Sequence, residues 1–128
     1  MNRTILGTAV FFGLLSVVLG AFGAHGLKSL ISESSLESYQ TGVAYQMYHA
    51  LVLLWLGSMA NWTATQKKWI YYCFTFGILL FSFSIYLLAT NDLSSINFTA
   101  IAFITPLGGG FLISGWLIMG YRVFKYLG

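Results

Sequence analysis

The chain has 128 residues, of which 58% are hydrophobic and 7% charged, and its formal net charge at pH 7 is +3. Soluble domains carry roughly 25% charged residues, so this composition excludes an ordinary soluble globular protein and indicates a membrane protein. The single cysteine, Cys73, excludes an internal disulfide and a cysteine-based metal site. We therefore expect one integral membrane domain that covers residues 1–128.

Four stretches are long and apolar enough to cross a membrane as helices, since a span needs roughly 20 mainly apolar residues. They are Thr4–Ala24, Gly42–Asn61, Trp69–Ala89 and Phe98–Gly120. Only helices and closed barrels satisfy all backbone polar groups in lipid, and no alternating strand pattern occurs. Short loops place consecutive helices side by side. The predicted fold class is therefore all-α, an up-down-up-down four-helix transmembrane bundle.

Charged residues separate by sign between the two sides of this arrangement. One side carries five of the six basic residues: Arg3, Lys67, Lys68, Arg122 and Lys125. The other side carries Lys28, Glu33, Glu37 and Asp92. Positive residues beside helix ends stay in the cytoplasm during insertion, so we expect both termini to be cytoplasmic. The basic residues are spread over three stretches, where anionic lipid headgroups account for them without a nucleic acid partner.

The first span carries small residues on one helical face, among them Gly13, Ser16 and Gly20. Small faces let two helix backbones approach closely, so we predict these three as helix-packing positions. Arg3 followed by an apolar run is also typical of a secretory signal. However, the run exceeds the roughly 7–15 residues of a signal core, and we expect this segment to be retained as a span.

The second helix is predicted to begin before the membrane. Ser34 and Glu37 have the spacing of a capping box, with Ser34 as the N-cap and Glu37 at the third helical position.

The fourth span contains Pro106, which removes a backbone donor and predicts either a kink or a break in the helix. A kink suits a helix that only packs, whereas a break suits a helix that lines a ligand cavity. Gly110 and Ser114 have small-xxx-small spacing and are the predicted packing positions of this span.

Polar side chains within the spans gather toward the outer side of the membrane. These candidate ligand or polar-network residues are His25, Tyr45, Gln46, His49, Ser82, Tyr86 and Thr105. Tyr45, Gln46 and His49 share one helical face at i, i+3 and i+4 spacing. Polar groups in hydrocarbon need partners, so we expect one polar cluster in the outer half of the bundle, with His49 near its centre.

Three interpretations of this cluster stay open: a network that only ties helices together, a pocket for a lipid headgroup or quinone, and a haem site. The helix network is the most frequent outcome. Haem is disfavoured because His25 and His49 differ in depth by about 10 Å, at ~1.5 Å per residue. Two histidines without a carboxylate make a poor metal site, and no nucleophile motif occurs. We therefore predict no catalytic residue, no metal, no cofactor and no enzymatic activity.

No aspartate, glutamate, lysine or arginine lies inside any predicted span. Proton-coupled pumps and small exporters depend on a membrane-embedded carboxylate, so a small transporter ranks last among the functions considered. The leading prediction is an accessory or structural membrane protein that works as a subunit of an assembly or as a homo-oligomer. Its partners would be membrane lipids, other membrane-protein subunits or itself. The alternative is a lipid- or quinone-binding protein with an outward-facing polar pocket.

The sequence also resembles a known family. The resemblance is carried by Gly20–Leu27, Thr41–Gln46 with His49–Leu51, Phe81–Tyr86, and Thr105–Gly109 with Gly115 and Trp116. These blocks are similar to domain-of-unknown-function family 423, which includes YgdD-like bacterial inner-membrane proteins and the animal transmembrane protein 256. Phe83 and Ile85 depart from the family pattern, which usually has Gly and Leu there. The resemblance implies the four-helix fold and a bacterial cytoplasmic (inner) membrane setting, and it implies no activity.

Overall fold

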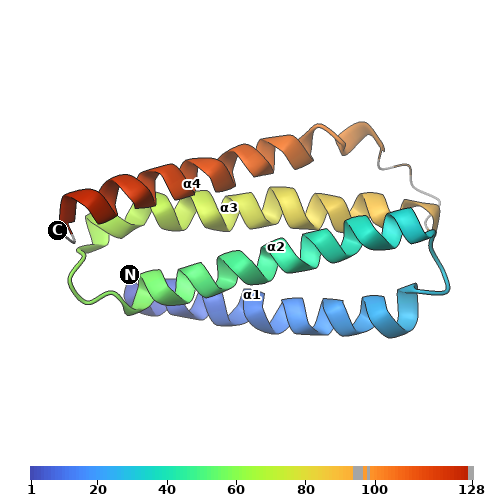
Figure 1. Ribbon diagram of the computed structural model, residues 1–128, viewed down its shortest axis with the longest axis horizontal. Helices are drawn as coiled ribbons and strands as arrows, with labels where there is room; N and C mark the ends of the chain where they lie inside the picture. Colours follow the sequence, from blue (N-terminus) through green and yellow to red (C-terminus); the bar gives the residue numbers. More distant parts are fainter. Residues whose placement is uncertain (94–96, 98, 127–128) are drawn as a thin grey trace.

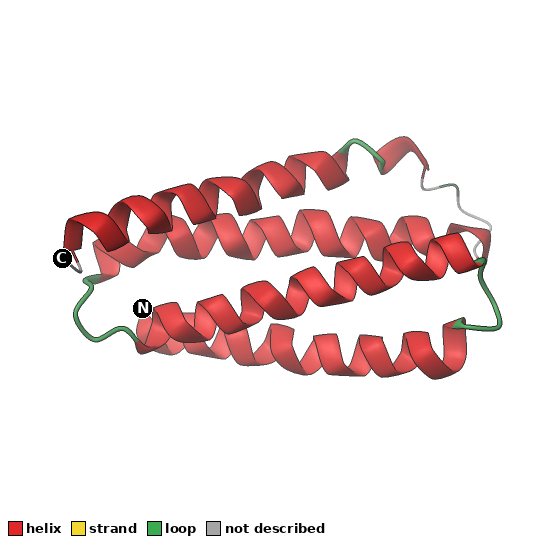
Figure 2. Cartoon of the chain, in the orientation of Figure 1, coloured by secondary structure: helices red, strands yellow, loops and turns green. Residues whose placement is uncertain are grey.

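Four long helices follow one another in antiparallel order in the computed structural model, which describes residues 1–93, 97 and 99–126 (Figure 1). They are α1 Asn2–Phe22, α2 Glu33–Ser58, α3 Ala64–Ala89 and α4 Ile104–Tyr126. The π-helical turn η1 (Gly23–Leu27) extends α1, and two short 3-10 turns, η2 (Asn91–Leu93) and η3 (Thr99–Ile101), lie between α3 and α4. No strand occurs in the described residues (Figure 2). The predicted all-α, up-down-up-down bundle is confirmed.

Each long helix packs mainly on its neighbour in the chain. Helix α1 packs on α2, α2 on α3 and α3 on α4, and the extensive contacts of α4 are with α3 alone. Figure 1 shows the resulting order, with α4, α3, α2 and α1 stacked from top to bottom. The four helices therefore form a row in which α1 and α4 are the edges. The edge helices keep wide apolar faces uncovered, for example at Leu14 and Val17 of α1 and Ile113 and Leu117 of α4.

Length and composition single out three of the four long helices as candidate membrane spans. Three helical segments are long and apolar enough to cross a membrane, Asn2–Leu27, Ala64–Ala89 and Ile104–Tyr126. The second helix, α2, is not among them, because its first half is rich in Ser, Thr, Gln and Glu. At ~1.5 Å per residue, its 26 residues still extend about 39 Å, and α2 lies between α1 and α3 in the row. Helix α2 thus has a polar first half and an apolar second half, and it is held between two apolar neighbours.

The start of α2 differs from the predicted capping box. The helix begins at Glu33, and its N-cap is Ser32, whose hydroxyl oxygen accepts the backbone N–H of Ser35 at 3.1 Å. The prediction of Ser34 as the N-cap was therefore wrong. Ser32 offers the same hydroxyl acceptor two residues earlier, and its extended backbone suits the position before a helix.

Helix α4 begins later than expected, and Pro106 neither kinks nor breaks its interior. Phe98, where the fourth span was predicted to begin, lies outside the described residues. The helix starts at Ile104, so Pro106 is its third residue. Backbone N–H groups in the first turn have no intrahelical acceptor, and proline loses nothing there. The expected kink or break was wrong because Pro106 belongs to a helix start.

Close contact between α3 and α4 depends on glycines. A Cβ atom on Gly108 would lie 2.3 Å from the backbone nitrogen of Phe81, so the two backbones nearly touch. A Cβ atom on Gly77 would lie 2.4 Å from Leu112, and one on Gly115 would lie 2.7 Å from Phe74. These three contacts fix the antiparallel register of the pair.

The predicted packing residues divide between the inside and the outside of the row. Ser16 is 2% exposed, and a Cβ atom on Gly20 would be in ordinary contact with Val43 of α2. Gly13 and Gly110 have no neighbouring atom within 4 Å of such a Cβ, and Ser114 is exposed. Gly13, Gly110 and Ser114 therefore face away from the neighbouring helices.

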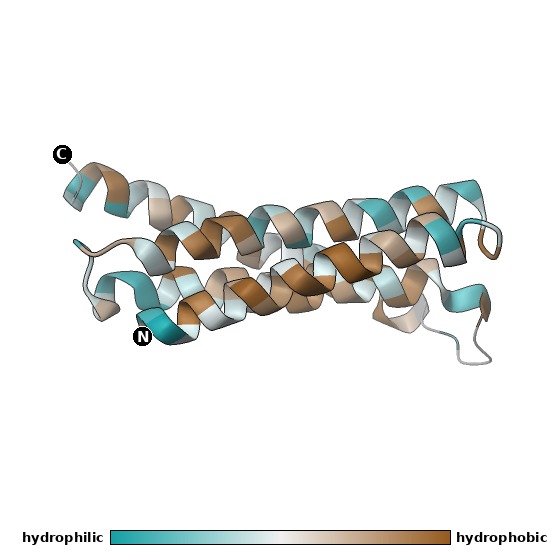
Figure 3. Ribbon diagram, turned by 90° about the horizontal axis from the view of Figure 1, so that it is seen from below, coloured by the Kyte–Doolittle hydropathy of each residue, from teal (hydrophilic) through white to brown (hydrophobic). Residues whose placement is uncertain are grey.

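Both termini lie at the same end of the row (Figure 1). The hydrophilic residues gather toward the two ends of the molecule, and apolar residues dominate the middle of α1 (Figure 3). Helix bounds place Arg3, Lys67, Lys68, Arg122 and Lys125 at the terminal end. The opposite end carries Lys28, Glu33, Glu37 and Asp92.

Candidate functional site

Gln46 of α2 ties together both neighbours of its helix. Its side chain is fully buried, and Nε2 donates to the backbone oxygen of Phe12 in α1 at 2.9 Å. Its Oε1 accepts the hydroxyl of Tyr86 in α3 at 2.7 Å. The Ser16 hydroxyl donates to the same Phe12 oxygen at 2.8 Å. One amide side chain thus connects three helices and leaves neither of its ends unpaired in hydrocarbon.

A second bond brings α3 against the backbone of α2. The Ser82 hydroxyl donates to the backbone oxygen of Gly42 at 2.7 Å, and Ser82 is fully buried. A Cβ atom at position 42 would lie 2.8 Å from the Tyr86 ring, so glycine is the residue that leaves room here. One turn earlier in α2, the Tyr39 hydroxyl donates to the backbone oxygen of Leu19 in α1 at 2.6 Å.

His49 connects α2 to the edge helix α4. It is 4% exposed, with Nδ1 lying 2.7 Å from the Tyr45 backbone oxygen and Nε2 lying 3.0 Å from Nε1 of Trp116. A carbonyl only accepts and an indole N–H only donates, so Nδ1 carries the proton and Nε2 is the acceptor. This assigns the neutral ring, packed against the Phe74 and Trp116 rings at centroid distances of 5.3 and 5.9 Å. Neither ring nitrogen is free to hold an ion while these bonds persist.

A side cavity of ≈ 370 Å³ opens beside this histidine. Its lining residues are Tyr45, His49, Phe81, Gly109, Leu112, Ile113 and Trp116. The cavity lies between α2 and α4 and is mainly apolar, with the His49–Trp116 bond as its polar feature.

The structure divides what the sequence predicts as a single cluster. Gln46, Ser82 and Tyr86 belong to one network between α1, α2 and α3, while His49 bonds to α4. Thr105 pairs with Ser84 at 2.6 Å in a separate contact between α3 and α4.

Two of the predicted members lie at the surface. Tyr45 is 41% exposed and packs its ring on Phe81 at 5.2 Å. His25 is exposed in η1, away from the other candidates. The expectation of one cluster centred on His49 was wrong, because α2 lies in the middle of the row. Gln46 and His49 consequently face different neighbours although they are only three residues apart.

Sequence reasoning did not predict that Trp116 and Ser84 form hydrogen bonds between helices. Trp116 was noted only as part of a motif, yet a tryptophan in mid-span, far from both membrane surfaces, signals that its N–H needs a buried partner. Ser84 likewise finds its partner Thr105 across the α3–α4 contact. The spacing of residues within one helix does not show which residues of two different helices come into contact.

Lys67 was expected at the membrane surface and is fully buried within the chain. Its ammonium donates to the Asn2 side-chain oxygen at 2.8 Å and to the Met59 backbone oxygen. Met59 directly follows the last residue of α2, where the unpaired carbonyls carry partial negative charge. The buried Lys67 ammonium is therefore accommodated by two oxygen acceptors rather than by a carboxylate. These bonds join the start of α1 to the end of α2.

Groups that could hold a metal ion do not occur in the part of the chain that the structure describes, where no three His, Cys, Asp or Glu side chains come together. The polar groups of this region act as hydrogen-bond partners in the structure, and both ring nitrogens of His49 are engaged in such bonds.

Comparison with known proteins identifies the relatives of this chain. A family profile described as "Protein of unknown function (DUF423)" matches residues 19–109. The UPF0382 membrane protein YwdK of Bacillus subtilis is 40% identical over 119 residues, which cover 89% of this chain and 90% of the relative. UPF0382 membrane proteins of Staphylococcus haemolyticus and Haemophilus influenzae are 36% and 34% identical, covering 90% and 98% of this chain and 90% and 97% of the relatives. No solved structure gives a significant match. The predicted resemblance is confirmed, and this membrane protein belongs to the DUF423 family.

Proposed function

We propose that this chain is a non-enzymatic accessory or structural protein of the bacterial cytoplasmic membrane, working as a subunit of a larger assembly or as a homo-oligomer. Its bacterial relatives are named membrane proteins, which supports the setting. The polar side chains of Gln46, Ser82 and Tyr86 form hydrogen bonds that tie helices together, as expected of a structural element.

The observation that carries this proposal is the uncovered face of α4. Gly110 and Ser114 form the small-xxx-small pair on that face, and nothing from the rest of the chain packs on Gly110. A shallow hollow of ≈ 340 Å³ runs over Pro106, Leu107, Gly110, Phe111 and Ser114. Helices associate in membranes by fitting side chains of one helix over the small residues of another. An edge helix with such a hollow is therefore suited to receive a helix from another chain.

The test replaces both small residues with leucine, Gly110→Leu with Ser114→Leu, and measures the assembly by native mass spectrometry after gentle extraction. We expect the wild type to be retained with a companion or as an oligomer, and the double variant to run as a single chain. Gly120→Leu is the matched control, since Gly120 is also open but lies on a different face of α4. A wild type that is always a single chain, or a double variant that assembles normally, would contradict the proposal.

A second candidate function, from a different class, is the binding of a lipid or quinone beside His49. The cavity of ≈ 370 Å³ and the two hydrogen-bonding rings at its wall support it, because an indole N–H that turned away from His49 could donate to a ligand carbonyl. His49→Ala should then remove any small molecule that co-purifies with the protein. Tyr48→Phe, a lipid-exposed change on the same helix, should leave its retention unchanged. Equal retention in the His49 variant rules this site out.

A further inference from the structure

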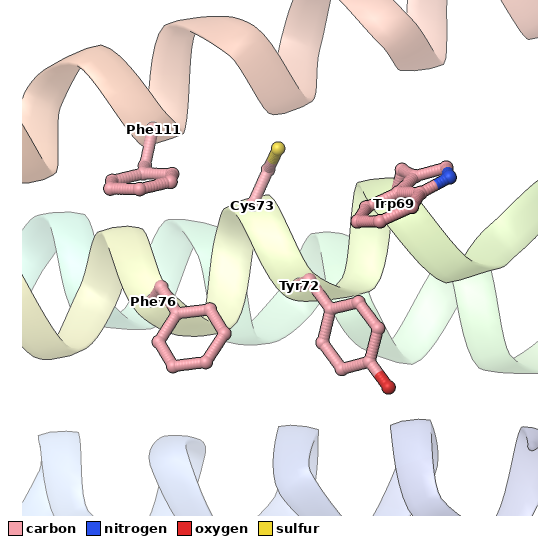
Figure 4. Close-up of a pocket in the computed structure, with 5 residues that line it drawn as sticks. All are labelled: Trp69, Tyr72, Cys73, Phe76 and Phe111. Atoms are coloured by element: carbon pink, nitrogen blue, oxygen red, sulfur yellow. The ribbon is translucent and has the colours of Figure 1, made fainter.

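A separate groove lies on the outer flank of α3, beside α4. It has a volume of ≈ 570 Å³ and is lined by Trp69, Tyr72, Cys73, Phe76 and Phe111. Figure 4 shows the Trp69 and Phe111 rings near the two ends of the space between the helices, with the Cys73 thiol between them. The four α3 residues are at i, i+3, i+4 and i+7, so they form one face about 10 Å long. The surface is apolar along its whole length and suits a hydrocarbon chain.

The helix register shows what lies at the end of this groove. Gly108 contacts Phe81, Leu112 contacts Gly77 and Gly115 contacts Phe74, so each step toward the end of α4 moves toward the start of α3. Continuing this register by two turns places Arg122 level with the first turns of α3, which carry Lys67 and Lys68. Arg122 also shares a flank of α4 with Phe111, because the steps 111, 115, 118 and 122 follow one helical face. The groove therefore leads from mid-membrane to a group of cations.

Lys68, Arg122 and Lys125 lie at this end of the row, where the described residues include no Asp or Glu side chain. Lys68 lies over the Trp69 ring at 5.2 Å, and Lys125 lies over Tyr121 and Tyr126 at 5.5 and 5.4 Å. The Nε of Arg122 is buried and has no hydrogen-bond partner. The chain has three acidic residues, Glu33, Glu37 and Asp92, and all of them lie at the opposite end of the row. Among the described residues, no Asp or Glu side chain neutralises these cations, and an anionic lipid headgroup is suited to do so.

We propose that this surface binds one anionic phospholipid from the leaflet at the terminal end of the row. Its acyl chain fills the groove between Trp69 and Phe111, and its phosphate is held by Lys68, Arg122 and Lys125. Arginine and lysine bind phosphate oxygens by charge-assisted hydrogen bonds, and each basic residue near an anionic surface contributes roughly 1 kcal/mol. A second copy of the chain is a poorer occupant of this groove, because a helix seated between Trp69 and Phe111 would bring its own basic end directly against Lys68, Arg122 and Lys125.

The experiment measures tryptophan quenching in vesicles whose lipids carry brominated acyl chains. At equal mole fraction, brominated phosphatidylglycerol should quench more than brominated phosphatidylcholine, and the excess should disappear in Trp69→Phe. Arg122→Gln with Lys125→Gln should lower the preference for phosphatidylglycerol by roughly fivefold per removed charge, the equivalent of about 1 kcal/mol each. Arg3→Gln removes a cation from the same end but from the opposite edge helix, and it should leave the preference unchanged.

Two further measurements separate this lipid site from its alternatives. Cys73→Phe fills the groove and should abolish the excess quenching without removing any charge. Equal quenching by the two lipids, or an excess that persists in the Arg122 and Lys125 variant, overturns the proposal. Because Cys73 is the sole cysteine, a disulfide-linked dimer formed through it on mild oxidation in the membrane would show that a second chain occupies the groove, which also overturns it.

Discussion

Gln46 illustrates how a single residue can serve three helices at once. Its donor and acceptor ends point to different neighbours, Phe12 of α1 and Tyr86 of α3. Hydrogen bonds between helices in a bilayer average about 0.6 kcal/mol, so their contribution to stability is modest. Their larger effect is on register, since an amide placed one turn higher or lower would lose both partners.

The bond between Gln46 and Tyr86 can be measured by a double-mutant cycle. Tyr86→Phe should lower the free energy of unfolding by about 0.6 kcal/mol, because the loss of one hydroxyl removes one bond. Gln46→Leu should cost more, since it removes two bonds and leaves the part-buried Tyr86 hydroxyl without its Gln46 partner. The double variant should therefore cost less than the sum of the two single variants.

Unfolding by detergent titration or steric trapping gives the four free energies of this cycle. Tyr72→Phe is the control, because Tyr72 is exposed to lipid and should tolerate the loss of its hydroxyl. Strict additivity of Gln46→Leu and Tyr86→Phe would mean that the two side chains do not interact in the membrane.

At the scale of the helix, the close contact between α3 and α4 depends on glycine residues, which have no side chain to keep the two helices apart. Gly77, Gly108 and Gly115 each leave space that a neighbour from the other helix occupies. The run Gly108–Gly110 indicates close contact in the sequence, and the structure shows that Gly108 is the member that meets backbone. Glycine lowers the intrinsic helix stability by about 1 kcal/mol relative to alanine, so the packing must offset this cost.

Alanine substitution should distinguish the glycines in contact from the open ones. Gly108→Ala places a methyl group against the Phe81 backbone, which cannot move aside as a flexible side chain would. We expect a net loss of about 1–3 kcal/mol of unfolding free energy, despite the better helix propensity of alanine. Gly120→Ala meets no neighbouring atom and should be neutral or slightly stabilising. Thermal unfolding in detergent measures both, and a Gly108→Ala protein as stable as the wild type would contradict the close contact.

The sequence predicts which segments form helices far better than it predicts the residues at which those helices begin and end. Apolar length alone identifies α1, α3 and α4, but Ser32, Ser34 and Ser35 offer similar capping chemistry, and only tertiary placement selects Ser32. For the candidate site, residue type identified Gln46, His49, Ser82 and Tyr86 as groups that need partners. The partners themselves depend on which helices are neighbours, and a single sequence does not carry that information.

At the scale of the whole molecule, the row has two chemically different ends. One end combines both termini with five basic residues, and the other carries all three acids. Since basic residues are retained on the cytoplasmic side, the terminal end is predicted to face the cytoplasm.

Two exposed positions test this orientation in a Cys73→Ser background. Ser34→Cys introduces a thiol at the acidic end, and Thr65→Cys introduces one at the basic end. A membrane-impermeant maleimide added to intact spheroplasts should label the thiol at position 34 and should reach position 65 only after lysis. Labelling of position 65 in intact spheroplasts would reverse the predicted topology.

The arrangement of the helices in a row also bears on how the chain is made. Since α2 packs on α1, α3 on α2 and α4 on α3, each helix finds its principal partner in the one synthesised immediately before it. The main contacts are therefore close in sequence, and low contact order favours rapid folding. Gln46 can bond to α1 before α3 exists, and Tyr86 completes the pair when α3 follows. The bundle can thus be assembled in the order of translation, and no helix has to wait for a distant segment before it finds its main partner.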